Sequence, residues 1–227
     1  MYFPYLRGRQ FELIALRDLV DKGVLSDKII PIIEPVKLSS TLIKTIESYG
    51  KKGKQLGIIV NPKVGGFKID IEEEKNLKLK NSLLTSLKEN DYILYMILLS
   101  ANLNPDEFIK KHKDNMGTIC DNKDAIPVYE ANFAKMKVKY NLIPDESGFR
   151  RKIRNNRVLL ADKFNKQERN NDYIEIIYVF LTIFLYLLKC PQSLILSALR
   201  AFCFCGKPRI SRSIFLYFPC QSWLKSW

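Results

Sequence analysis

Short, mostly apolar runs alternate with helix-like patterns along the first 165 residues of this 227-residue chain. This alternation limits the fold more than any other feature of the sequence. Each run is rich in β-branched or aromatic residues and is bounded by Pro, Gly, Asn or Asp, which is typical of a buried strand. The runs predict strands in KIIPIIEPV (28–36), QLGIIVNP (55–62), DYILYMILLS (91–100), AIPVYEANF (125–133) and RVLLADKF (157–164).

Helical patterns lie between several of these runs. The segment FELIALRDLVDKG ends at Gly23, a natural C-terminal cap, and Ser39 or Ser40 can cap the helix that begins with TLIKTIESYG. Residues 104–107 place a cap, a proline and two acids ahead of FIKKHK. The first of these helices has four apolar residues on one face: Leu13, Leu16, Leu19 and Val20.

Strands that are apolar throughout and alternate with helices are typical of parallel β/α units covered on both faces. The predicted class is therefore α/β. A closed (β/α) barrel and an open doubly wound sheet both fit this class, but the glycine fingerprint of a dinucleotide-binding open sheet is missing after the first strands. We favour the barrel. Since such barrels seldom have fewer than about 200 residues, the body of this chain predicts an incomplete (β/α) barrel-like domain.

The composition changes sharply after Glu175. All 24 acidic residues precede position 176, and the remaining 52 residues (227 minus 175) contain none, although four of the five cysteines lie there. We therefore divide the chain into a truncated barrel-like domain, 1–175, and an apolar, acid-free tail, 176–227.

Three interpretations of the tail remain open. It is the product of a frameshift in an A/T-rich gene, or a weak membrane segment over 176–199, or an ordinary buried helix. A membrane segment would have to contain Lys189 and Pro191. No signal peptide precedes Arg7 and Arg9, so a cytoplasmic protein is expected, with membrane attachment as the alternative.

The chain carries a formal net charge of +13, which favours polyanions as partners. The strongest basic cluster is a run of five cations beside Phe149. Arginine forks match phosphate oxygens, so this run predicts salt-sensitive binding to nucleic acid, with a solvated helix or loop as the alternative. Its cations are Arg150, Arg151, Lys152, Arg154 and Arg157.

Three segments together resemble the beta protein family, which is named for a protein of T-even phages. They are YFPYLRGRQFELIAL (2–16), IIPIIEPVK (29–37) and GIIVNP (57–62). They share an aromatic-x-Pro-x-Leu-Arg pattern, a Gln-x-Glu followed by Ala-Leu, and a Pro-x-Ile-Glu strand. The resemblance covers roughly residues 1–165. It implies a β/α-barrel-like fold and, for some bacterial members, a phage-defence or mobile-element setting. Together with the basic cluster, this setting favours association with nucleic acid or with a protein partner. The resemblance implies no catalytic residues.

Arg7, Glu34 and Asn61 each fall at or near the end of a predicted strand. In β/α barrels the carboxyl ends of the strands form the active site. A guanidinium, a carboxylate and an amide at this edge could bind a phosphate or carboxylate and supply a general base. An enzyme acting on an anionic small molecule is therefore the alternative to a nucleic-acid-associated or partner-binding role. The structural alternative is an ion pair between Glu34 and Arg7 at the barrel rim.

Other residues have plainer interpretations. Gly65 and Gly66 predict a turn. We expect His112 to be a solvated side chain and Cys120 to pack at a strand end. The pair Cys203 and Cys205 has no histidine nearby, so we interpret both as plain thiols and expect neither a metal nor a cofactor.

Overall fold

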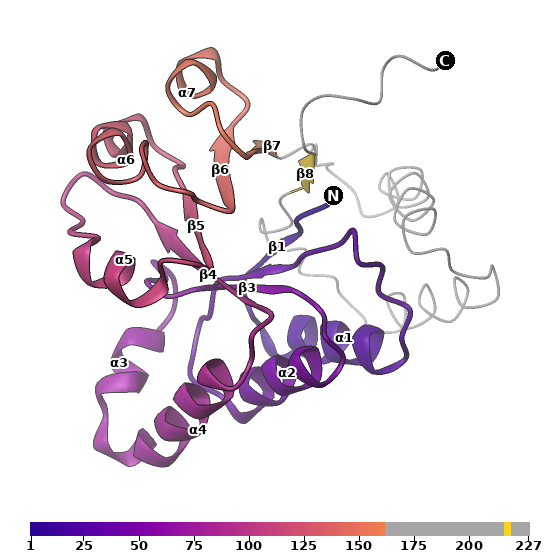
Figure 1. Cartoon of the computed structure of the whole chain (residues 1–227). Coiled ribbons are helices and arrows are strands. Elements are labelled where there is room, and N and C mark those ends of the chain that lie inside the picture. The colour runs from indigo at the N-terminus through magenta and orange to yellow at the C-terminus, as the bar shows by residue number, and fades with distance from the viewer. Residues whose placement is uncertain (162–215, 219–227) are drawn as a thin grey trace, which may run out of the picture.

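The computed structural model describes residues 1–161 and 216–218, in which strands and helices alternate (Figure 1). The strands of this part of the chain are β1 (Tyr5–Leu6), β2 (Ile32–Ile33), β3 (Leu56–Ile59), β4 (Ile93–Leu98), β5 (Met116–Ile119), β6 (Tyr140–Pro144), β7 (Arg157–Ala161) and β8 (Leu216–Phe218). Its helices are α1 (Gln10–Asp21), α2 (Ser40–Lys51), α3 (Phe67–Glu72), η1 (Glu74–Asn76), α4 (Leu77–Lys88), α5 (Asp106–His112), η2 (Lys123–Ala125), α6 (Ile126–Asn132) and α7 (Ser147–Lys152).

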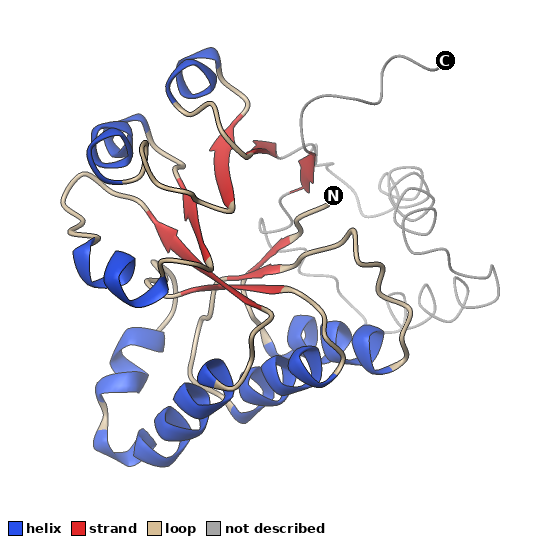
Figure 2. Cartoon of the chain, in the orientation of Figure 1, coloured by secondary structure: helices blue, strands red, loops and turns tan. Residues whose placement is uncertain are grey.

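The strands form one sheet in sequence order, β1 to β8. Strands β1 to β7 are all parallel, and β8 pairs antiparallel with β7. This order does not reverse as it does in a doubly wound sheet. Instead the seven parallel strands curl into a half-barrel with the helices outside it (Figure 2). The prediction of an incomplete (β/α) barrel-like domain is confirmed.

Both faces of the sheet are buried, which explains why the strands are apolar throughout. In β4, Leu94, Met96 and Leu98 belong to the cluster on the inner face, while Ile93 and Ile97 pack under the helices. Two glycines make room in the inner layer. A Cβ on Gly57 would lie 2.3 Å from Cδ1 of Ile32, and one on Gly117 would lie 2.4 Å from Sδ of Met96.

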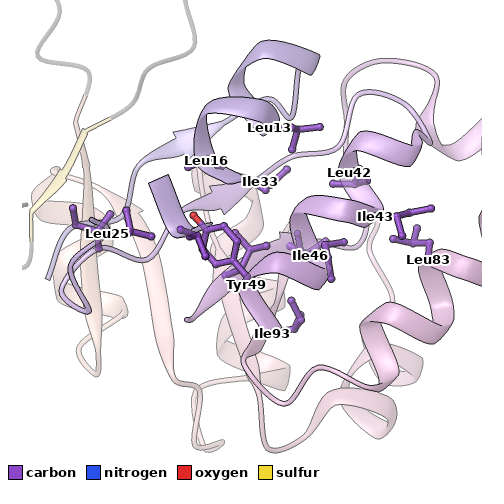
Figure 3. Close-up of a cluster of buried hydrophobic side chains, with 14 of the residues drawn as sticks. Leu13, Leu16, Leu25, Ile33, Leu42, Ile43, Ile46, Tyr49, Leu83 and Ile93 are labelled. Atoms are coloured by element: carbon purple, nitrogen blue, oxygen red, sulfur yellow. The ribbon is translucent and has the colours of Figure 1, made fainter. Parts of the chain in front are cut away.

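The first outer cluster lies between the sheet and helices α1, α2 and α4 (Figure 3). Leu13 and Leu16 of α1 face Ile46 and Tyr49 of α2, and all four are buried. Burial of one such aliphatic side chain contributes about 1.5–3 kcal/mol. A second outer cluster lies under α5, α6 and α7. Of the apolar face predicted for the first helix, Leu13, Leu16 and Val20 are buried in this cluster, whereas Leu19 is not part of it.

The cap predicted for the second helix is confirmed, and side chains also bind backbone N–H groups at the starts of α1 and α5, where Pro105 is the N-cap residue of α5. Ser39 caps α2, since its Oγ accepts a hydrogen bond from the Leu42 N–H at 3.2 Å. In α1, Glu12 accepts the N–H of Arg9 at 3.1 Å. Ahead of α5, Oδ1 of Asn104 accepts the N–H of Asp106 at 3.0 Å. Each bond satisfies an N–H at a helix start that has no partner within the helix.

The strand predicted at 125–133 is wrong. This segment forms η2 and α6, with Pro127 in the first turn of the helix, where its missing N–H costs nothing. Ala125, Tyr129 and Phe133 recur at every fourth position and are all buried, which is a helical and not a strand period. The neighbouring strands β5 and β6 were not among the predicted runs.

The predictions for the tail fall mostly outside the described residues. The segment 176–199 and its interpretation as a membrane span lie there, as does the proposed frameshift boundary after Glu175. Of the tail, only β8 is described, at the edge of the sheet. Within the described residues, no helix has the length and apolar character needed to cross a membrane.

Candidate functional site

The three residues predicted to line a site all lie at the carboxyl edge of the sheet. Arg7 directly follows β1, Glu34 directly follows β2, and Asn61 comes two residues after β3. Because the strands are parallel, their carboxyl ends meet at one edge, which is where β/α barrels hold their ligands. The structure therefore brings the three positions to one end of the half-barrel, although their partners differ.

Glu34 is a buried carboxylate, 4% exposed, held by two neutral donors. The Tyr5 hydroxyl donates to its Oε2 at 2.7 Å, and the backbone N–H of Lys63 donates to its Oε1 at 2.9 Å. These bonds join the ends of β1, β2 and the loop after β3. A carboxylate oxygen can accept two hydrogen bonds, so with respect to residues 1–161 and 216–218 both oxygens keep acceptor capacity.

Arg7 lies next to this group. Its Nε is buried and has no hydrogen-bond partner among the described residues. No ion pair joins Arg7 to Glu34 within the described part of the chain, so the expected ion pair at the rim is not formed there. A buried polar atom without a partner is costly. The Arg7 guanidinium can therefore gain from an acceptor that a ligand brings.

The pKa of the Tyr5 phenol depends on the charged side chains at this edge of the sheet. Burial raises the pKa of Tyr5 above its usual value, and the charges of Glu34 and Asp121 raise it further, while Arg7 lowers it. Charged residues that follow β1, β2 and β5 therefore all shift the pKa of one hydroxyl group. A raised pKa keeps the phenol protonated, as its hydrogen bond to Glu34 requires.

The turn after β1 depends on Gly8. This residue has a φ of +57°, in the left-handed region that glycine tolerates best. A Cβ here would lie 2.9 Å from Cγ2 of Ile33 and 3.3 Å from the carbonyl oxygen of Glu34. Gly8 thus allows the Arg7 turn to lie directly against the end of β2.

Asn61 has a different role from Arg7 and Glu34. Its Nδ2 donates to the carbonyl of Leu98 at 2.8 Å, and its Oδ1 accepts the Leu98 N–H at 2.8 Å. The amide therefore extends the pairing of β3 with β4 by imitating a backbone unit. Both polar groups of the side chain are engaged, so Asn61 positions the loop after β3.

The loop after β3 crosses this edge of the sheet, and Lys63 lies in it. The ammonium of Lys63 approaches both carboxylate oxygens of Asp121, which follows β5, at 3.4 and 3.5 Å. Both side chains are about half exposed. Gly65, at a φ of +75°, lies so close to Val36 that a Cβ would overlap its carbonyl, and the N–H of Gly66 donates to that carbonyl at 2.8 Å. The expected turn at Gly65 and Gly66 is present and fixes the loop.

Cys120 lies beside Asp121 and is fully buried, as expected for packing at a strand end. Burial, and to a lesser extent the charge of Asp121, raises the pKa of its thiol to about 12. The reactive form of cysteine is the thiolate, and the raised pKa keeps Cys120 in the thiol form near neutral pH.

The basic run extends from the last residues of α7 through the following loop to Arg157, the first residue of β7. Two of its cations are paired with acids: Arg150 with Asp145 at 2.7 Å and Lys152 with Glu130 at 2.9 Å. The others contact backbone or solvent. Nε of Arg154 donates to the carbonyl of Arg151, and Nη1 of Arg157 donates to the carbonyl of Arg150. In the described residues, no acid pairs with Arg151, Arg154 or Arg157.

His112 is not the solvated side chain that its lysine neighbours suggested. Its ring stacks on Tyr95, with centroids 3.8 Å apart, and also contacts Phe108. Burial, and secondarily the charge of Lys111, lowers the pKa of His112 to about 4. The imidazole is therefore a neutral packing group between α5 and β4.

Tyr5, Lys63 and Asp121 belong to the candidate site but were not predicted. Asp121 directly follows the strand-like run MGTIC (116–120), so recognising that run as a strand would have placed it at the same edge. Lys63 lies in NPKVGG, close behind Asn61. Its contribution is partly a backbone N–H, which no pattern of side chains can reveal.

Comparison of the chain with models of known protein families, with curated proteins and with solved structures finds no match.

Proposed function

We propose that the chain binds a small anionic molecule, a carboxylate or a phosphate, at the carboxyl edge of its half-barrel and acts on it as an enzyme. The observation that supports this most directly is the buried Nε of Arg7, which lacks a hydrogen-bond partner among the described residues. A guanidinium presents its N–H groups in a fork that matches carboxylate and phosphate oxygens. Arg7 is the anion-binding residue in this proposal.

Glu34 is the general base of the proposed reaction. The two donors hold its carboxylate in one orientation, and burial keeps bulk water away from it. A base must lie within hydrogen-bond reach of the proton that it accepts. Glu34 and Arg7 follow adjacent strands, so an anion on Arg7 would lie beside this carboxylate.

Binding to the full 227-residue chain can be measured by isothermal titration calorimetry, with inorganic phosphate and succinate as probes. Arg7→Met should weaken binding of the better probe at least about tenfold, because a charge-assisted hydrogen bond contributes about 1.5–3 kcal/mol. Glu34→Gln should strengthen it, because a negative charge beside the anion is removed. The matched control is Arg17→Met on α1, which should bind normally.

Circular dichroism and thermal unfolding would show that the variants remain folded. If neither probe binds the unsubstituted protein, the proposed function is wrong. Equal affinity in the unsubstituted protein and in a folded Arg7→Met variant would also contradict it.

A second candidate function is association with nucleic acid through the basic run, in the phage-defence or mobile-element setting that the resemblance to the beta protein family implies. Arg151 and Arg154 support it, since both are exposed and lack an acidic partner in the described part of the chain. Such contacts would bind phosphates with little sequence preference and weaken as salt rises.

The double variant Arg151→Glu and Arg154→Glu should lose salt-sensitive retention of single- or double-stranded DNA or RNA in a filter-binding assay. The corresponding control is Arg17→Glu in α1 together with Lys22→Glu at the C-terminal cap of α1, which makes the same change in net charge away from the run. Unchanged retention in the first variant would exclude the basic run as the binding surface.

A further inference from the structure

Lys63 has two separate contacts at the candidate site. Its backbone N–H holds Glu34 at 2.9 Å, and its ammonium faces Asp121 at 3.4 and 3.5 Å. The first contact fixes where the side chain starts. The second brings a cation to the same edge of the sheet as Arg7, from the loop after β3.

The backbone around Lys63 is held on both sides. Asn61 binds both backbone groups of Leu98, and the Gly66 N–H binds the Val36 carbonyl. The ammonium is therefore the part of this residue that can change partners, because it lies at the end of four methylene groups and is about half exposed.

The contact between Lys63 and Asp121 is weak enough to be exchanged. Its distances are long for a charge-assisted hydrogen bond, which is usually 2.7–2.9 Å. Solvent-exposed ion pairs contribute only about 0–1 kcal/mol. An anion bound at Arg7 could take Lys63 as its second cation at little cost.

We propose that Lys63 is the second cation of the anion site and that Asp121 competes with the ligand for it. This inference rests on the proposed function, since it needs an anion at Arg7. Asp121 then sets the affinity of the site: the ligand must replace its carboxylate at the Lys63 ammonium before both cations can bind it.

The competition predicts opposite effects of two neutral substitutions on the affinity for phosphate or succinate, whichever binds better. Lys63→Met should weaken binding about five- to tenfold. It keeps the backbone N–H that holds Glu34. Asp121→Asn should strengthen binding about two- to fivefold, which corresponds to the small free energy of an exposed ion pair.

The double variant separates competition from simple charge repulsion. If Asp121 acts by occupying Lys63, Asp121→Asn should have no effect on affinity in the Lys63→Met background. If Asp121 repels the anion directly, the gain should persist there, and the proposal is wrong. Controls are Asp18→Asn and Lys51→Met, which change the same charges near the C-terminal ends of α1 and α2 and should leave affinity unchanged.

The outcomes also separate this inference from the proposed function. If Arg7→Met abolishes binding while both Lys63→Met and Asp121→Asn bind normally, the anion site stands and the role of Lys63 is rejected. If neither anion binds the unsubstituted protein by calorimetry, both proposals fail.

Discussion

The hydroxyl of Tyr5 donates a 2.7 Å hydrogen bond to Oε2 of Glu34, and both side chains are buried. Tyr5 lies in β1 and Glu34 directly follows β2, and these two strands are short, with two residues each. The side-chain bond therefore adds to a brief backbone pairing at the edge where Arg7 lies. The same hydrogen bond therefore stabilises this end of the half-barrel and fixes the orientation of the Glu34 carboxylate in the candidate site.

Tyr5→Phe should lower the free energy of unfolding by about 1.5–3 kcal/mol, because it removes a hydrogen bond to a buried charged group without changing the ring. Urea denaturation would measure the change. Tyr140→Phe is the matched control. Among the described residues its hydroxyl reaches only Sδ of Met1, a weak acceptor, at 3.5 Å, so the change should stay below about 0.5 kcal/mol. Equal effects of the two substitutions would show that the Tyr5–Glu34 bond contributes no special stability.

Gly57→Ala should destabilise the fold by about 1–3 kcal/mol, because its new Cβ would meet the Ile32 side chain inside the half-barrel. Gly148→Ala in α7 is the control. A Cβ there has nothing within 4 Å, so this variant should be neutral or slightly more stable. Chemical denaturation of the two variants tests how tightly the inner layer is packed. An unchanged free energy of unfolding in Gly57→Ala would show that the Ile32 side chain does not restrict this position.

Much of the fold could be predicted because both faces of the sheet are covered. Buried strands such as β3 and β4 are apolar throughout, and helices such as α1 show their apolar face and their caps directly in the sequence. The segment 125–133 was misassigned because aromatic and β-branched residues obscured its four-residue spacing. Strand β6 was missed because it contains Asn141, which is buried and accepts a 2.6 Å hydrogen bond from Thr118.

The candidate site could be predicted only in part. Arg7 and Glu34 were correctly expected at one edge of the sheet because each follows a strand. The carboxyl ends of parallel strands meet at one edge whatever the side chains are. The partners of Glu34 could not be predicted, because one is a backbone N–H and the other, Tyr5, looked like an ordinary strand residue. The role of Asn61 depends on the register between β3 and β4, which no local pattern specifies.

Asn61→Asp should lower the free energy of unfolding by about 1–3 kcal/mol. The substitution replaces the Nδ2 donor with an oxygen that faces the Leu98 carbonyl, so the carbonyl loses its partner. The control is Asn104→Asp ahead of α5, where the side chain acts as an acceptor for the Asp106 N–H and aspartate serves equally well. Urea unfolding of the two variants should therefore differ clearly, and similar curves would exclude the proposed pairing of Asn61 with β4.

The stacked His112 predicts a loss of stability in mild acid. Its pKa is lowered from 6.5 to about 4 by burial and by Lys111, so between these values the unfolded chain binds a proton that the folded chain does not. Stability therefore falls as pH drops from about 6.5 to about 4. His112→Phe keeps a ring against Tyr95 and removes the titration, so its free energy of unfolding should fall less between pH 7 and pH 5 than that of the unsubstituted protein.

The same ring gives a direct measurement, because His112 is the only histidine in the chain and its proton resonances can be followed by NMR without ambiguity. The unsubstituted protein should titrate near pH 4, well below an ordinary histidine. Lys111→Met should raise this value slightly, since the lysine charge is the smaller of the two causes and burial remains. A midpoint near 6.5 in the folded protein would mean that the ring is solvated, and the stability argument for His112→Phe would then fail as well.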